Sequence, residues 1–150
     1  MEIRDFDLHT LSALSYRMRT CEFGGTWNPT ALILEFSGVY GWGSQGNGDA
    51  DFIAAIKAAA LEVLHVEAVV FDFREMSYEW GNRIWEVLHC RRPDGDTSLP
   101  VAMVISDECR PGFAGCTKMV PPMFESLEQA LRFVEGPSRE YLTDLMHGID

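Results

Sequence analysis

The stretch VEAVVFDF, residues 66–73, decides the fold. Its core from Ala68 to Phe71 is continuously apolar, which is typical of a strand buried on both faces of a parallel sheet. A second apolar run, ALILEFSG at residues 31–38, is bounded by turn residues and predicts another strand. A third run, LPVAMVIS at residues 99–106, predicts a third buried strand.

Helical patterns follow these strands. An apolar stripe at helical spacing begins after residue 48, with Asp49 or Asp51 as the expected cap: Phe52, Ile53, Ile56, Ala60, Leu61 and Leu64. Residues 82–89 predict a second helix and residues 127–134 a third, whose start at Ser126 and Gln129 resembles a capping box. Gly136-Pro137 is expected to end it, with a last helix over 139–146.

Strand and helix alternate, and this order indicates right-handed crossovers on a mainly parallel sheet. We therefore expect one α/β domain over residues 1–150, with helices packed against a mixed sheet. Residues 1–30 allow two interpretations. Leu8, Leu11, Leu14 and Met18 could line a helix, whereas residues 15–23 could form a strand. Residues 107–122 are expected to form a long loop.

Composition limits the classes of partner. The 150 residues are 47% hydrophobic and carry a formal charge of -11, which disfavours nucleic acid and favours a basic protein surface. No apolar run is long enough for a membrane span, and no signal peptide is recognisable. The four cysteines lack CxxC spacing, so a cytoplasmic protein with reduced thiols is expected.

Catalytic and cofactor motifs are incomplete. Gly41, Gly43 and Gly46 match GxGxxG, but Asp72 follows Gly41 by 31 residues, against about 20 in dinucleotide sites. A surface loop is the favoured interpretation. Asp72, Glu75 and Glu79 cluster after a strand without a recognisable catalytic partner. The sequence therefore predicts no catalytic residue and no cofactor, and it favours a non-enzymatic function while an enzyme stays an open alternative.

Metal binding is a further alternative, for which the sequence gives little support. Cys109 and Cys116 could lie near His89 and Cys90 and form a zinc site, but buried, inert thiols are favoured. We therefore predict no metal ligands.

Several segments together resemble the STAS family of anti-sigma-factor antagonists. They are ALILEFSG, DFIAAIKAAALEVL, VVFDFREMSYEWGNRIWEVL, PVAMVISD and MFESLEQALRFV, which lie between about Ala31 and Val134. Family members carry an Asp-Leu-Ser-like strand end, then an aromatic residue and Asp-Ser-Ser/Thr-Gly. Asp72-Phe73-Arg74 and Tyr78 match the first parts, but Gly81 stands where the phosphorylated serine would be.

The resemblance implies a non-enzymatic, regulatory module of bacterial type that binds a protein partner through this turn, without a phosphorylation switch. The expected contact residues are Tyr78, Glu79, Trp80, Asn82 and Arg83, with Trp42 nearby.

Two other functions remain open. The net charge of -11 also fits an acidic immunity or inhibitor protein that neutralises a basic toxin. The strand-helix rhythm also resembles crotonase-like and Clp-like enzymes, in which Gly112 to Gly115 could serve as an oxyanion hole.

Overall fold

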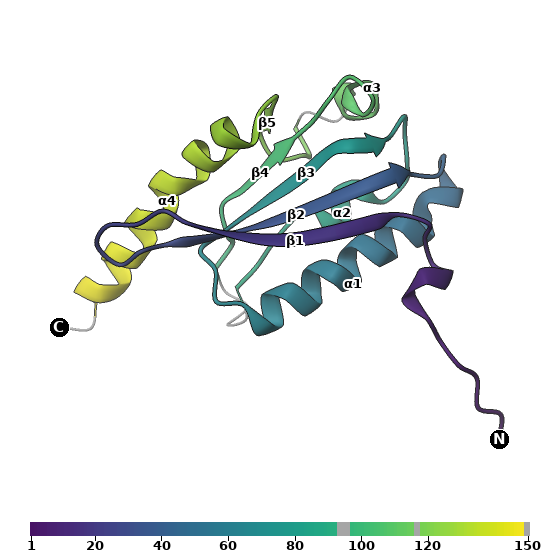
Figure 1. Cartoon of the computed structure of the whole chain (residues 1–150), viewed down its shortest axis with the longest axis horizontal. Coiled ribbons are helices and arrows are strands. Elements are labelled where there is room, and N and C mark those ends of the chain that lie inside the picture. The colour runs from purple at the N-terminus through teal and green to yellow at the C-terminus, as the bar shows by residue number, and fades with distance from the viewer. Residues whose placement is uncertain (93–96, 116–117, 149–150) are drawn as a thin grey trace.

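The computed structural model describes residues 1–92, 97–115 and 118–148, and in them five strands form one mixed sheet (Figure 1). The strands lie in chain order: β1 Ser15–Glu22, β2 Thr30–Val39, β3 Ala68–Ser77, β4 Val101–Val104 and β5 Met123–Phe124. β1 is antiparallel to β2, and the other neighbours are parallel. The predicted single α/β fold with a mainly parallel sheet is therefore confirmed.

Helices cover both faces of the sheet. They are α1 Asn47–Val63, α2 Ile84–Val87, α3 Arg110–Ala114 and α4 Leu127–His147, with short 3-10 turns η1 Leu8–Thr10 and η2 Ser44–Gly46. From β2 to β4 the sheet grows in one direction, so right-handed crossovers place α1 and α2 on the same face. The long α4 returns across the other face (Figure 1).

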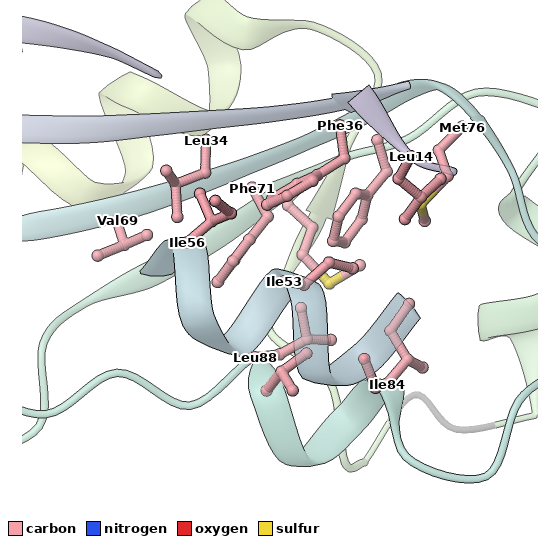
Figure 2. Packing of buried hydrophobic residues seen from close by; sticks show 14 of the residues in the cluster. Leu14, Leu34, Phe36, Ile53, Ile56, Val69, Phe71, Met76, Ile84 and Leu88 are labelled. Carbon is pink, nitrogen blue, oxygen red and sulfur yellow. The ribbon is translucent and has the colours of Figure 1, made fainter. Parts of the chain in front are cut away.

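Alternating side chains make a separate core on each face. Leu34 and Phe36 of β2 and Phe71 and Phe73 of β3 point towards α1 and α2, where Ile53 also packs (Figure 2). The opposite positions form the second core, with Ala130 and Val134 of α4: Ala31, Ile33, Ala68, Val70, Ala102 and Val104. β3 is thus buried on both faces over Ala68–Phe73, as its continuous apolar run predicts.

Part of the N-terminal segment, Ser15–Glu22, forms a strand. Residues 15–22 pair with β2 over their full length, so the interpretation as a strand is confirmed and the helical stripe is wrong. Leu14 is 1% exposed because it enters the core, whereas Met18 is 41% exposed on β1. Residues 107–122 are also not wholly a loop, because α3 lies within them.

The expected break at Gly136-Pro137 is wrong, because α4 continues through Pro137. Proline removes only the bond to the carbonyl of Phe133, and both residues lie on the exposed side of α4. On the buried side, Ser138 Oγ donates to the carbonyls of Val134 at 2.7 Å and Glu67 at 3.3 Å. Burial of that side against the sheet outweighs the proline.

The predicted bounds of two further helices are wrong. α2 spans only Ile84–Val87, shorter than the expected 82–89, and α1 begins at Asn47, before either proposed cap. The Asp49 carboxylate instead accepts hydrogen bonds from the Gly41 amide and the Ser12 hydroxyl. At α4, Ser126 Oγ accepts from the Gln129 amide at 3.2 Å, which confirms Ser126 as its cap.

Candidate functional site

The loops after β2 and β3 form one continuous surface at the sheet edge where these parallel strands end. The Tyr40 amide donates to the Ser77 carbonyl at 3.0 Å, and the Gly43 amide donates to the Trp80 carbonyl at 3.3 Å. Gly43 and Gly81 form an isolated parallel bridge. Because the bonds are between backbones, the two loops are held at one fixed separation.

Two tryptophans project from these joined loops. Trp42 is 57% exposed and Trp80 is 54% exposed. The Trp80 ring lies directly against Gly43, where an added Cβ would come within 2.6 Å of it. Gly43 also has a φ of 53°, which favours glycine. Because Gly43 has no side chain, the Trp80 indole can pack directly on its backbone, next to Trp42.

Tyr78, predicted as a contact residue, is 2% exposed and cannot form the outer surface. Its ring packs edge-on against Tyr40 with centroids 5.1 Å apart, and against Phe113 of α3 at 4.6 Å. An extra residue in β3 between Asp72 and Glu75 shifts the alternation, so that Tyr78 points into the same core as Phe73, which is the physical reason for the correction. Tyr78 supports the two loops from below.

The remaining predicted residues carry polar groups beside the tryptophans. Glu79 and Asn82 are exposed. The guanidinium of Arg83 donates to Asp51 at 2.8 Å and to Glu86 at 3.0 Å. Since one arginine faces two carboxylates and Glu79 adds a third, this part of the surface carries more negative than positive charge.

We name this surface the tryptophan edge; it consists of the exposed residues Trp42, Glu79, Trp80 and Asn82 and the half-buried Arg83. It contains five of the six residues expected from the sequence and excludes Tyr78.

The glycine-rich loop beside the tryptophan edge is filled by the chain's own groups. A Cβ at Gly46 would lie 2.3 Å from the Tyr40 ring and 2.4 Å from the Gly41 carbonyl. The Asp49 carboxylate sits in the first turn of α1 and takes the Gly41 amide at 2.8 Å. An acid at that position repels a phosphate, so these glycines serve internal packing rather than a nucleotide.

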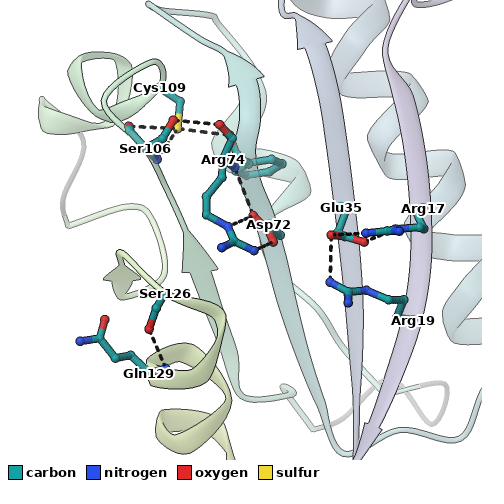
Figure 3. Close-up of polar contacts among 10 residues, drawn as sticks. Arg17, Arg19, Glu35, Asp72, Arg74, Ser106, Cys109, Ser126 and Gln129 are labelled. Atoms are coloured by element: carbon teal, nitrogen blue, oxygen red, sulfur yellow. Dashed lines mark hydrogen bonds and ion pairs between the residues drawn. The ribbon is translucent and has the colours of Figure 1, made fainter.

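A second polar group of residues was not foreseen from the sequence. α4 covers only one part of its sheet face, and beyond it a hollow of about 470 Å³ opens over β1, β2 and β3. Arg17 and Arg19 donate to Glu35 at 2.6 and 2.9 Å, and Arg74 donates to Asp72 at 2.6 Å (Figure 3). The alternation of Arg17 and Arg19 along β1 was the available signal, but only the strand pairing brings Glu35 between them.

These ion pairs bear on the acids considered for catalysis. Asp72 is 4% exposed in its side chain and bound by Arg74 through two guanidinium nitrogens. Both oxygens of this carboxylate are engaged by Arg74, so neither is presented freely to a substrate. Glu75 and Glu79 are exposed. The geometry therefore does not assemble the three acids into an acid–base pair.

Glu35 predicts a small loss of stability in acid. The hydrogen bond from Arg17 lowers the pKa of the Glu35 carboxyl from its ordinary value of 4.5, and the charge of Arg19 acts in the same direction. Because the folded pKa is the lower one, the contribution is complete above pH 4.5 and is lost as the pH falls through the folded value. Solvent-exposed Arg17 limits it to less than about 1 kcal/mol.

The measurement is urea unfolding of the wild type and Glu35→Gln at pH 7 and at low pH. The difference between the two proteins should shrink in acid. A matched control is Glu128→Gln, whose partner Arg132 lies on the outside of α4. A difference that stays constant or grows in acid would contradict this assignment.

Cys90 and Cys109 have buried thiols, whereas Cys21 is partly exposed. Burial raises the pKa of Cys90 to about 11 and also raises the pKa of Cys109. Cys116, part of the zinc alternative, lies outside the described residues. Among residues 1–92, 97–115 and 118–148, no three His, Cys, Asp or Glu side chains gather closely enough to hold a metal ion.

Comparison with known proteins does not assign the chain to a family. No family model matches the chain, and no curated protein matches it. Within the part of the chain that the structure describes, no helix has both the length and the apolar character needed to cross a membrane.

Proposed function

We propose that this chain is a non-enzymatic protein-interaction module similar to anti-sigma-factor antagonists, and that it binds its partner through the tryptophan edge. The observation that carries the proposal is the joining of two loops so that Trp42 and Trp80 are both more than half exposed at one sheet edge. The strand and helix order expected from the resemblance supports it. Within this proposal, the chain is a cytoplasmic regulatory protein of bacterial type.

Physical chemistry supports this choice of surface. Tryptophan is enriched among the residues that dominate binding energy, because a large rigid ring gains contact area at little entropic cost. Here the Gly43–Gly81 bridge and the buried Tyr78 ring hold the loops in advance of binding. A preorganised surface loses less conformational entropy when a partner docks.

Charge indicates the chemistry of the partner. Asp51 and Glu86 both pair with Arg83, exposed Glu79 lies in the same turn, and the whole chain carries -11. A basic protein surface is therefore the best complement, with association that slows as salt rises. The same charge supports the second candidate, an acidic inhibitor of a basic toxin, which would use the same surface.

The test is quantitative capture of partners from cells that make this protein, followed by affinity measurement on the protein recovered. Trp80→Ala should weaken binding about tenfold or more, because truncating a central interface tryptophan typically costs over 1 kcal/mol. Trp27→Ala is the matched control, since Trp27 is 53% exposed in the turn between β1 and β2.

Glu79→Lys should slow association and reduce its salt dependence. Equal affinity of wild type and Trp80→Ala would rule out the tryptophan edge as the binding site. If the recovered partner is an enzyme that loses activity in the complex, the inhibitor candidate replaces the regulatory one.

A further inference from the structure

Most cations of this chain are already matched with acids. Eight of the twelve Lys and Arg side chains form ion pairs within the described residues: Arg4, Arg17, Arg19, Arg74, Arg83, Arg110, Arg132 and Arg139. The four that do not are Lys57, Arg91, Arg92 and Lys118. In a chain with 23 acids, chance would scatter unmatched cations widely.

These four cations instead line three adjoining hollows. Arg91 and Lys118 line the first, Arg91 and Lys57 the second, and Arg92 the third. The first and second hollows share His89 and Arg91, and the first and third share Leu99. The Lys and Arg side chains that lack an ion pair with any described residue are therefore gathered in one region.

Two of these cations have other partners in that region. Lys57 Nζ donates to the carbonyls of Val87 at 2.6 Å and His89 at 2.7 Å, just after α2. The guanidinium of Arg92 lies 3.4 Å from the centre of the Tyr141 ring. Arg91 and Lys118 have neither an ion pair nor a side-chain hydrogen bond within the described residues, and Arg91 is exposed.

The hollow shared by Arg91 and Lys118 has a volume of about 290 Å³. No Asp or Glu among the described residues lines it, and His89 adds a third nitrogen group. Burial raises the pKa of the neighbouring Cys90 thiol to about 11, so this thiol stays protonated at neutral pH and adds no negative charge. Apolar side chains of Val101, Met119 and Val120 form one part of the remaining wall.

We propose that this cationic hollow, lined by His89, Arg91 and Lys118, binds a small organic anion whose carboxylate or phosphate group is attached to an apolar body. The two unmatched cations suit the anionic group, because hydrogen bonds between ionised partners are stronger than neutral ones. The apolar wall suits the body. A volume of about 290 Å³ lies at the lower end of ligand pockets, which run from about 300 to 1,000 Å³.

The site is separate from the tryptophan edge. Leu99 and Val101 stand at the start of β4, whereas Trp42 and Trp80 follow the ends of β2 and β3. Because these strands are parallel, the two sites lie at opposite edges of the sheet. The inference therefore stands independently of the proposed partner, and Trp80→Ala should leave anion binding unchanged.

The test is calorimetric titration of the full chain with four probes: phenyl phosphate, benzoate, phenol and inorganic phosphate. At least one of the two aromatic anions should bind saturably and about tenfold or more tightly than phenol, since phenol lacks the charge. Comparison of phenyl phosphate with benzoate identifies the preferred anionic group. Phenyl phosphate should also exceed inorganic phosphate, because only the former has an apolar body.

Variants place the binding in the hollow. Arg91→Gln with Lys118→Gln should weaken binding of the preferred probe about tenfold or more. Arg132→Gln, on α4 and paired with Glu128, is the matched control and should leave it unchanged. Thermal melting without ligand establishes that each variant is folded.

Three results would overturn the inference. They are absence of saturable binding of both aromatic anions, equal affinity in the double glutamine variant, and inorganic phosphate binding as tightly as phenyl phosphate. Asp94 and Asp96 lie outside the described residues, so an Asp94→Asn/Asp96→Asn variant completes the design. Binding by this variant and not by the wild type would mean that the chain's own acids occupy the cations.

Discussion

Replacing Phe71 with alanine is expected to lower the free energy of unfolding by about 3–5 kcal/mol, the usual cost of truncating a fully buried phenylalanine. Phe71 is 0% exposed in the middle of β3 and faces α1. Its ring stacks on Phe73 with centroids 5.7 Å apart, and Figure 2 shows it between Leu34 and Ile53. Strands on both sides and the helix above restrict collapse, so the cavity should persist.

Urea unfolding followed by circular dichroism measures this loss. For a domain of this size the melting temperature should fall by about 2–4 °C per kcal/mol. Phe6→Ala is the matched control, because Phe6 is 71% exposed before η1 and should change stability by less than about 0.5 kcal/mol. A loss below about 1 kcal/mol for Phe71→Ala would contradict the placement of this ring in the core.

The sequence was most informative where local pattern and burial agree. The runs at 31–38 and 66–73 predict β2 and β3 because continuous apolar residues need cover on both faces, which α1, α2 and α4 supply. β1 was ambiguous because it is an edge strand whose residues are largely exposed on both faces, so it lacks such a run. Its pairing with β2 over Ser15–Glu22 is what selects the strand.

Predictions from local sequence were wrong where contacts with distant residues determine the structure. Proline usually ends a helix, yet Pro137 stays within α4, because the opposite side of that helix is buried against the sheet. Tyr78 was expected at the surface because it precedes a predicted helix, but Phe113, 35 residues later, supplies an aromatic surface for its ring. Neither contact can be inferred from nearby sequence.

The same limit applies to the sites. The exposure of Trp42 and Trp80 was foreseeable, since glycines and polar residues surround them. The cationic hollow was not, because Arg91 and Lys118 are 27 positions apart. Their significance depends on knowing that eight of the ten arginines have acid partners, which only the three-dimensional structure reveals.

Replacing Gly81 with serine is expected to destabilise the chain by about 2–3 kcal/mol rather than to create a phosphorylation switch. Serine is the residue that the STAS resemblance would place here, but Gly81 is buried. An added Cβ would lie 2.7 Å from the Tyr40 ring and 3.4 Å from the Tyr78 ring. Tyr40 is 1% exposed and cannot move freely, so the added atoms overpack the turn.

Chemical unfolding measures the effect, with Gly136→Ser as the matched control. No atom outside the helix backbone lies within 4 Å of a Cβ at Gly136, so that change should stay within about 0.5 kcal/mol. A Gly81→Ser protein as stable as the wild type would show that the turn has room for the hydroxyl. In that case, only the missing serine side chain at position 81 would separate this turn from the phosphorylation motif that the resemblance implies.

A double-mutant cycle separates overpacking from other causes. Tyr40→Leu removes the ring atoms nearest Gly81, at its own cost to the core. If the clash is the cause, adding Gly81→Ser to Tyr40→Leu should cost at least about 1 kcal/mol less than in the wild type, a coupling typical of contacting residues. Additive costs would contradict it. Coupling would mean that the Tyr40 ring fills the space that a serine side chain needs at position 81.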